Sequence, residues 1–241
     1  MLLIKLSRYE FRRFIRYLFG MLILALGSVV AIKSGLGVSP ITSLPFGINN
    51  VTNISIGTAS AILYSSYVGI QFVILKRDFK KLQLLQIVFA ILFGSIVNFF
   101  NGIININFNN FVLNLLLLLI SFVFTALGVT LTIKANLVPV APDGLVQALS
   151  QKYNAPFGKI KIYFDSIVVI LSCSLMLCVK GGIEGIGIGT ILSVFTVGKM
   201  ISYFSKEEVL EWEWDYLWKQ KDAIKAVQNL MIDDVMDQGK I

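Results

Sequence analysis

The sequence predicts an all-α polytopic membrane protein of six transmembrane helices, arranged as two inverted three-helix repeats. Composition is the first observation behind this fold class. Of the 241 residues, 56% are hydrophobic and only 15% are charged, whereas soluble domains average roughly 45–50% and about 25%. The second observation is a series of apolar runs near the ~20 residues that a helix needs to cross a bilayer. The third is an internal repeat.

The repeat aligns residues 27–57 with residues 128–158 without a gap. Gly27 aligns with Gly128, and Lys33 with Lys134. In each copy an apolar run ends at a lysine, a segment bearing Gly or Pro follows, and a second apolar run opens at a glycine. Residues 92–100 also match residues 196–204, at an offset three residues larger. Only two copies exist, and each is too long for a solenoid unit, so the pattern indicates a duplicated half-protein.

The chain divides into four parts. Residues 1–16 form a basic N-terminus, residues 17–110 and 111–205 form the two membrane repeats, and residues 206–241 form a charged, helix-prone tail. A cleaved signal peptide is the alternative interpretation of the first apolar run, but the run continues into the repeat and further spans follow. The predicted spans are residues 17–32, 57–75, 82–100, 111–133, 160–179 and 186–204.

The placement of basic residues predicts the orientation. With a cytoplasmic N-terminus, every Lys and Arg except Lys33 and Lys180 falls on the cytoplasmic side, as the positive-inside rule requires. We therefore expect a multi-pass protein of the bacterial cytoplasmic membrane with both termini in the cytoplasm. Each repeat has an odd number of spans, so the second enters the membrane inverted. Inverted repeats are typical of transporters and channels.

A breaker follows the first span of each repeat, at residues 35–50 and 136–151. Glycine and proline there free backbone groups that survive at membrane depth only if they are buried in protein or line water. Thr42 and Asp143 are equivalent, and either could cap a following short helix. The breakers are either re-entrant segments that bind a ligand at helix N-termini or ordinary surface loops. Their motif residues are Gly35, Gly37, Pro40, Pro139, Pro142 and Gly144.

Four charged residues are further candidates. Lys33 and Lys134 end the first and fourth spans, where they either snorkel to the headgroups or contact an anion from both sides. Asp165 and Lys199 are set furthest inside spans at matching depths, which predicts an ion pair of structural or functional importance. The complete set of candidate residues for a substrate or ion pathway is Lys33, Thr42, Ser43, Lys134, Asp143, Asp165 and Lys199.

Two other polar features favour packing roles. Asn98 lies within the third span, where we expect it to hydrogen-bond between helices. The glycines of residues 182–190 lack the strand–turn–helix context and the lysine of a phosphate-binding loop. They therefore predict close packing at the entry to the last span.

Several functions are excluded or disfavoured by composition. The chain has no histidine, and Cys173 and Cys178 are five residues apart in one apolar run, which does not place them on one helix face. We expect no metal site, no cofactor and no disulfide. Without a nucleophile–base set we also expect no enzyme. The net charge of +7 follows from topology, and no basic–aromatic patch indicates nucleic-acid binding.

Four motifs carry a resemblance to a known family: IKSGLGVSP at residues 32–40, NISIGTAS at 53–60, IKANLVPVAPDGL at 133–145 and GGIEGIGIGT at 181–190. Together they resemble the YczE/YyaS/YitT-type family of bacterial integral membrane proteins over about residues 15–205. The resemblance implies location and fold rather than a substrate. The chain departs from the family pattern at Ile41–Thr42, where similar proteins often carry an aromatic residue and an aspartate, and at 138–142, where a glycine-richer string is common.

The function predicted from these observations is a small-solute or ion transporter of unknown substrate in the lipid bilayer. The alternative is a non-transporting membrane protein that scaffolds or regulates a cytosolic or membrane partner through residues 207–228, whose apolar side chains recur at helical spacing. The sequence leaves homo-oligomer formation open.

Overall fold

The computed structural model describes residues 2–106 and 108–205, with side chains from residue 11 onward. Residues 1–202 form one compact unit, and a second unit begins at Tyr203. Of this second unit, residues 203–205 are described, and the rings of Tyr203 and Phe204 are in edge contact. The predicted tail at residues 206–241, with its partner segment 207–228, lies outside the described residues. The α-helices are α1 (Leu2–Lys33), α2 (Pro40–Thr52), α3 (Ile56–Leu75), α4 (Leu85–Ile103), α5 (Phe111–Lys134), α6 (Ala141–Tyr153), α7 (Phe157–Lys180) and α8 (Ile188–Phe204).

Five helical segments of the described chain are long and apolar enough to cross a membrane. They are Phe11–Lys33, Ile56–Asp78, Lys81–Ile103, Phe111–Lys134 and Phe157–Lys180, each of 23 or 24 residues. Large apolar side chains such as Phe72 and Phe111 expose more than half of their surface, which suits lipid better than water. These helices indicate a membrane-embedded protein. The predicted sixth span corresponds to α8, which is apolar but has only 17 residues, so its crossing of the membrane stays a prediction.

Both breakers fold into short helices, α2 and α6, of 13 residues each. Such a helix is about 20 Å long and cannot cross a hydrocarbon core of about 30 Å. In each, the first turn is buried and the last residue is exposed. A left-handed asparagine ends each helix, at Asn53 and Asn154. The breakers are therefore helices whose N-termini enter the protein, not surface loops.

The helix boundaries repeat at the spacing of the sequence repeat. The first and fifth helices end at the equivalent residues Lys33 and Lys134, and the bounds of α2 recur in α6. Two residues after each lysine the backbone turns left-handed, at Gly35 (φ +68°) and Asn136 (φ +49°). Glycine adopts this conformation freely, and asparagine is the side chain that tolerates it best.

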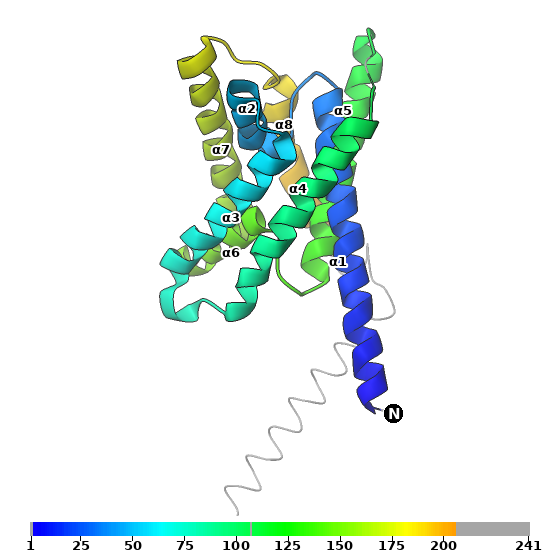
Figure 1. Ribbon diagram of the computed structural model, residues 1–241, viewed down its shortest axis with the longest axis vertical. Coiled ribbons are helices and arrows are strands. Elements are labelled where there is room, and N and C mark those ends of the chain that lie inside the picture. The colour runs from blue at the N-terminus through cyan, green and yellow to red at the C-terminus, as the bar shows by residue number, and fades with distance from the viewer. Residues whose placement is uncertain (1, 107, 206–241) are drawn as a thin grey trace, which may run out of the picture. The chain divides into compact units, whose positions relative to one another are not determined.

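Three pairs of helices pack across the two halves. α1 packs on α5, α2 on α7, and α3 on α6; in Figure 1 α6 lies below α2. At the crossing of α1 and α5, a Cβ on Gly27 would lie 2.7 Å from the backbone nitrogen of Thr125. A Cβ on Gly128 would lie 2.5 Å from that of Leu24. Gly27 is equivalent to Gly128, and Leu24 is equivalent to Thr125. The two contacts are therefore related to each other by the sequence repeat.

The third helix of the first half packs closely on the fourth. Gly57 and Gly94 are in such close backbone contact that a Cβ on either would collide with the carbonyl oxygen of the other. The side chain of Asn98 accepts a hydrogen bond from the Gly57 N–H (2.9 Å) and donates one to the Ser55 hydroxyl (3.0 Å). The predicted role of Asn98 in helix–helix bonding is confirmed.

The glycine-rich loop before α8 packs on the linker between α1 and α2. The Val38 N–H donates to the carbonyl of Gly185 (3.0 Å), and the Gly189 N–H donates to the carbonyl of Leu36 (3.1 Å). A Cβ on Gly37 would meet the backbone nitrogen of Thr190. Close packing by this loop is therefore confirmed.

Candidate functional site, a buried charged cluster

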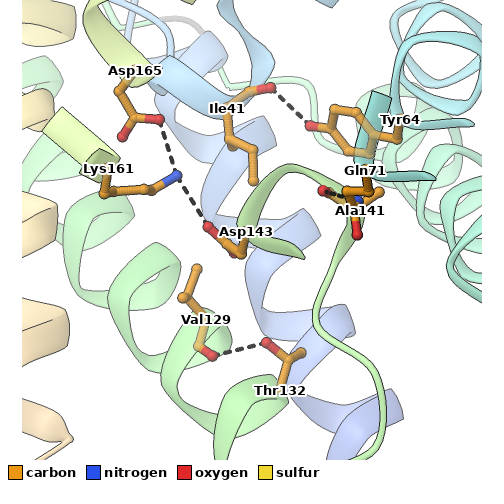
Figure 2. A network of polar contacts seen from close by, with 9 residues as sticks. All are labelled: Ile41, Tyr64, Gln71, Val129, Thr132, Ala141, Asp143, Lys161 and Asp165. Carbon is orange, nitrogen blue, oxygen red and sulfur yellow. Dashed lines mark hydrogen bonds and ion pairs between the residues drawn. The ribbon is translucent and has the colours of Figure 1, made fainter. Parts of the chain in front are cut away.

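Three charged side chains meet inside the helical unit. The Lys161 ammonium lies 2.9 Å from Asp165 Oδ1 and 3.1 Å from Asp143 Oδ1, and Figure 2 shows it between the two carboxylates. The relative exposures of Asp143, Lys161 and Asp165 are 1%, 5% and 6%. We call these three residues the charged cluster. Charged groups are rarely this buried unless they are paired.

The helices position each member of the cluster. Lys161 and Asp165 are four residues apart on α7, and therefore on one face. Asp143 is the third residue of α6, in the first turn. A carboxylate is stabilised there because the helix dipole places partial positive charge at the N-terminus. The cluster thus joins the start of the short helix α6 to the long helix α7.

The cluster has more negative than positive charge. Two carboxylates and one ammonium give a formal charge of −1, and burial makes such an excess costly. Asp143 Oδ2 and the Tyr17 hydroxyl are both buried without a hydrogen-bond partner in the part of the chain that the structure describes. Tyr17, on α1, lies within electrostatic range of Asp143. Both atoms therefore retain unused hydrogen-bonding capacity next to the charged cluster.

Aromatic side chains enclose the cluster. Tyr64 is fully buried on α3, and its hydroxyl donates to the carbonyl of Ile41 (2.8 Å) in the first turn of α2. The ring of Phe164 packs edge-on against that of Tyr67 at 5.6 Å and lies 5.8 Å from the Lys161 ammonium. These rings give the cluster an aromatic border on the side of α3 and α7. The two short helices α2 and α6 each pack on both α3 and α7, and Figure 2 labels Ile41 of α2 and Asp143 of α6 on either side of that packing.

A pair of amides secures the beginning of α6. The side chains of Gln71 and Gln86 donate to each other at 2.8 and 3.1 Å, and Gln71 also donates to the carbonyl of Ala141 (3.1 Å). A Cβ on Gly144 would come within 2.9–3.0 Å of these amides. Gly144, one of the predicted breaker glycines, therefore leaves the space that the buried Gln71–Gln86 pair occupies.

The first half fills the equivalent region with hydroxyls. The Thr42 hydroxyl donates to the carbonyl of Ser39 (3.1 Å), and that of Ser43 donates to the carbonyl of Pro40 (2.8 Å). The expectation that Thr42 or Asp143 caps its helix is wrong, since each is the third residue. The N-caps are Ser39 and Val140. Proline in the first turn has a preset helical φ and begins each helix earlier.

The other breaker residues support the backbone around the site. The first-turn prolines Pro40 and Pro142 are buried, and Pro139, in the linker before α6, is half-buried. Gly35 turns the chain left-handed after α1, and Gly37 allows close contact with the residues that begin α8.

The remaining predicted charges lie apart from the cluster. Lys199 is exposed on α8, so the expected pairing of Asp165 with Lys199 is wrong, and Asp165 pairs with Lys161 instead. The depth of each charge within its predicted span could not reveal that Lys161 lies on the same face of α7 as Asp165. Lys33 and Lys134 are half-buried at their helix ends, and among the described residues no ion pair or hydrogen bond involves either side chain.

Lys161 is the residue that sequence reasoning missed. It was assigned to the cytoplasmic basic set with Lys152 and Lys159, yet its four-residue spacing from Asp165 is the spacing of a helical ion pair. That spacing was the available signal. In the described chain, no group of three or more His, Cys, Asp or Glu residues is arranged to hold a metal ion.

Comparison with known proteins identifies the family but no activity. Residues 11–206 match a family of unknown function, DUF6198, and the chain belongs to that family. It is similar to an uncharacterized protein of Haemophilus influenzae, at 28% identity over 187 residues, covering 78% of this chain and 80% of the relative. No solved structure matches the chain. The YczE/YyaS/YitT-type resemblance stays a prediction.

Proposed function

We propose that this DUF6198 member is a small-solute or ion transporter of the bacterial cytoplasmic membrane. In this proposal it has six spans in two inverted three-helix repeats, with both termini in the cytoplasm. The matched helix bounds, the left-handed residues at matched places and the exchanged contacts between α1 and α5 support the repeat. The inverted arrangement itself is typical of transporters.

The charged cluster is the observation that carries the proposal. Ionisable groups inside a membrane protein are costly, and they mark substrate or ion pathways by default. Asp143, Lys161 and Asp165 are buried among membrane-crossing helices and have an excess negative charge. A bound cation or polar solute would offset this formal excess, which supports a binding role for the cluster.

The two short helices suggest where the pathway lies. Each is too short to cross the membrane, and each directs its N-terminal turn toward the interior. Helix N-termini offer free N–H groups and partial positive charge to a ligand. We place the solute between the first turns of α2 and α6. There the Asp143 carboxylate and the neighbouring Tyr17 hydroxyl have buried oxygen atoms without a hydrogen-bond partner among the described residues.

The test begins with a thermal-shift screen of the purified protein against inorganic ions and small polar solutes. A ligand at 100 times its Kd stabilises the folded state by about 2.7 kcal/mol, so a hit raises Tm. Each hit is then assayed for flux into proteoliposomes. We expect Asp143→Asn to abolish both the Tm shift and the flux.

The matched control is Asp78→Asn, which removes an exposed carboxylate from the turn after α3 and is expected to leave both readings unchanged. Flux that persists in Asp143→Asn would contradict the assigned pathway. Binding without flux of any hit would contradict transport itself.

A further inference from the structure

The two halves differ in how their last helices pack. In the first half, α4 packs closely on α3 and also contacts α1. In the second half, α8 forms no extended backbone packing with any helix of the described chain. The repeat makes α7–α8 the counterpart of α3–α4, so the difference lies within an otherwise matched pair.

The face of α8 nevertheless matches that of α4. Thr190, Val194, Val197 and Ile201 are buried, as are their equivalents Gln86, Ala90, Phe93 and Val97. The exception is the glycine within this face. Gly94 is buried on α4, but its equivalent Gly198 is half-buried.

The glycines that bring α3 and α4 together also occur in the second half. Gly57 corresponds to Gly158 on α7, and Gly94 corresponds to Gly198 on α8. A Cβ on either Gly158 or Gly198 would meet nothing within 4 Å. A glycine inside a helix costs roughly 0.5–1 kcal/mol relative to alanine, and close backbone approach is what offsets that cost in membrane helix pairs. In this structure the glycines of α3 and α4 approach closely, whereas those of α7 and α8 do not.

We propose that the protein adopts a second conformation in which α8 packs on α7, with Gly158 and Gly198 meeting as Gly57 and Gly94 do. This inference rests on the inverted repeat of the proposed function. The present structure is then the state in which the first half is packed and the second half is open. The occupant of the open α7 face is α8 of the same chain, because the packed pair in the first half supplies the template.

Such a movement reaches the charged cluster directly. Lys161 is one helical turn after Gly158 on α7, and residues three apart share a face. Packing α8 at Gly158 therefore changes what borders Lys161 and, through it, Asp143 and Asp165. A transporter whose two halves exchange packed and open states would alternate the side from which the cluster is reached.

A disulfide between α7 and α8 tests the movement. In a Cys173→Ser, Cys178→Ser background, Gly158→Cys and Gly198→Cys are combined and oxidised in native membranes. Disulfides require Cα atoms about 4.4–6.8 Å apart, so a bond forms only if the helices approach. Both substitutions point into open space and should not disturb folding. We expect oxidation to consume both free thiols while the protein still migrates at the mass of a monomer.

The control pair is Gly158→Cys with Gly182→Cys, also an open position. Gly158 lies at the start of α7 and Gly182 lies beyond its end; the helix from Gly158 to Lys180 alone spans about 33 Å at a rise of 1.5 Å per residue, so no intrachain bond can form. Retention of both thiols in the test pair would overturn the proposal. Oxidation only in a dimer-mass band would also overturn it, in favour of a second copy as the occupant. Neither outcome depends on a transported solute, so a failure here is distinct from a failure of transport.

Discussion

The two predicted repeats have equivalent helix starts at α2 and α6 and at α3 and α7, but they differ in their chemistry. The charged cluster of the second half, Asp143, Lys161 and Asp165, corresponds at the repeat spacing to Thr42, Ser60 and Tyr64 of the first. All six side chains are buried. The three in the first half are neutral and satisfied locally, since Thr42, Ser60 and Tyr64 donate to the carbonyls of Ser39, Ile56 and Ile41.

This comparison separates what holds the fold from what distinguishes the site. Breaker prolines, left-handed asparagines and the glycines at the crossing of α1 and α5 occur in both halves. They set helix ends and backbone approach. Three differences at matched positions then distinguish an ionic region from a neutral one, while the starts of the helices that carry them stay equivalent.

The largest expected effect concerns the lysine of the cluster. Lys161→Met leaves two buried carboxylates without their cation, and removing one partner of a buried ion pair costs about 3–5 kcal/mol. Ser60→Ala at the matched position removes one local hydrogen bond, worth about 1 kcal/mol. Unfolding of both variants in detergent measures the difference. Equal loss in the two variants would mean that the charges add nothing to the scaffold.

An intermediate effect is expected at the helix-packing glycines. Gly94→Ala places a methyl group against the carbonyl of Gly57, and such overpacking costs about 1–3 kcal/mol. Gly198→Ala meets open space and should change stability by less than about 1 kcal/mol. The comparison is read from the Tm of each variant. A larger loss for Gly198→Ala would show that α7 and α8 are already packed.

Smaller effects are expected where α3 and α7 each hydrogen-bond the short helix of the other half. Gln71 donates to Ala141, and its equivalent Ser172 donates to the carbonyl of Ser43 (2.7 Å). Gln71→Leu leaves the Gln86 amide and a carbonyl unpaired, at about 1–3 kcal/mol, whereas Ser172→Ala loses about 1 kcal/mol. Urea or thermal unfolding ranks the two. The reverse order would contradict the importance of the amide pair for α6.

Much of the architecture could be predicted because it depends on local patterns. Apolar runs and flanking lysines locate the ends of the long helices to within a few residues, except that α1 begins at Leu2 and not near residue 17. Gly35 and Pro40 indicate breaks that the backbone makes. The helix starts within the breakers were less accurate. Thr42 and Asp143 were expected as caps, but the prolines begin each helix earlier.

The site was only partly predictable because its contacts join distant segments. Asp143 and Asp165 stood out as acids in apolar surroundings, but the sequence does not state that α6 brings one to the other. Lys161 resembled a topology signal, and Lys199 resembled a partner. Which lysine faces inward depends on the rotation of α7 and α8, which the packing of other helices decides.

Side-specific labelling shows whether the two predicted repeats are inverted in the membrane. Thr52→Cys and Tyr153→Cys replace equivalent, exposed residues at the ends of α2 and α6. Each is placed in a background without Cys173 and Cys178 and treated with a membrane-impermeant maleimide. We expect labelling of Thr52→Cys in intact cells and of Tyr153→Cys only after permeabilisation. Labelling of both from the same side would contradict it.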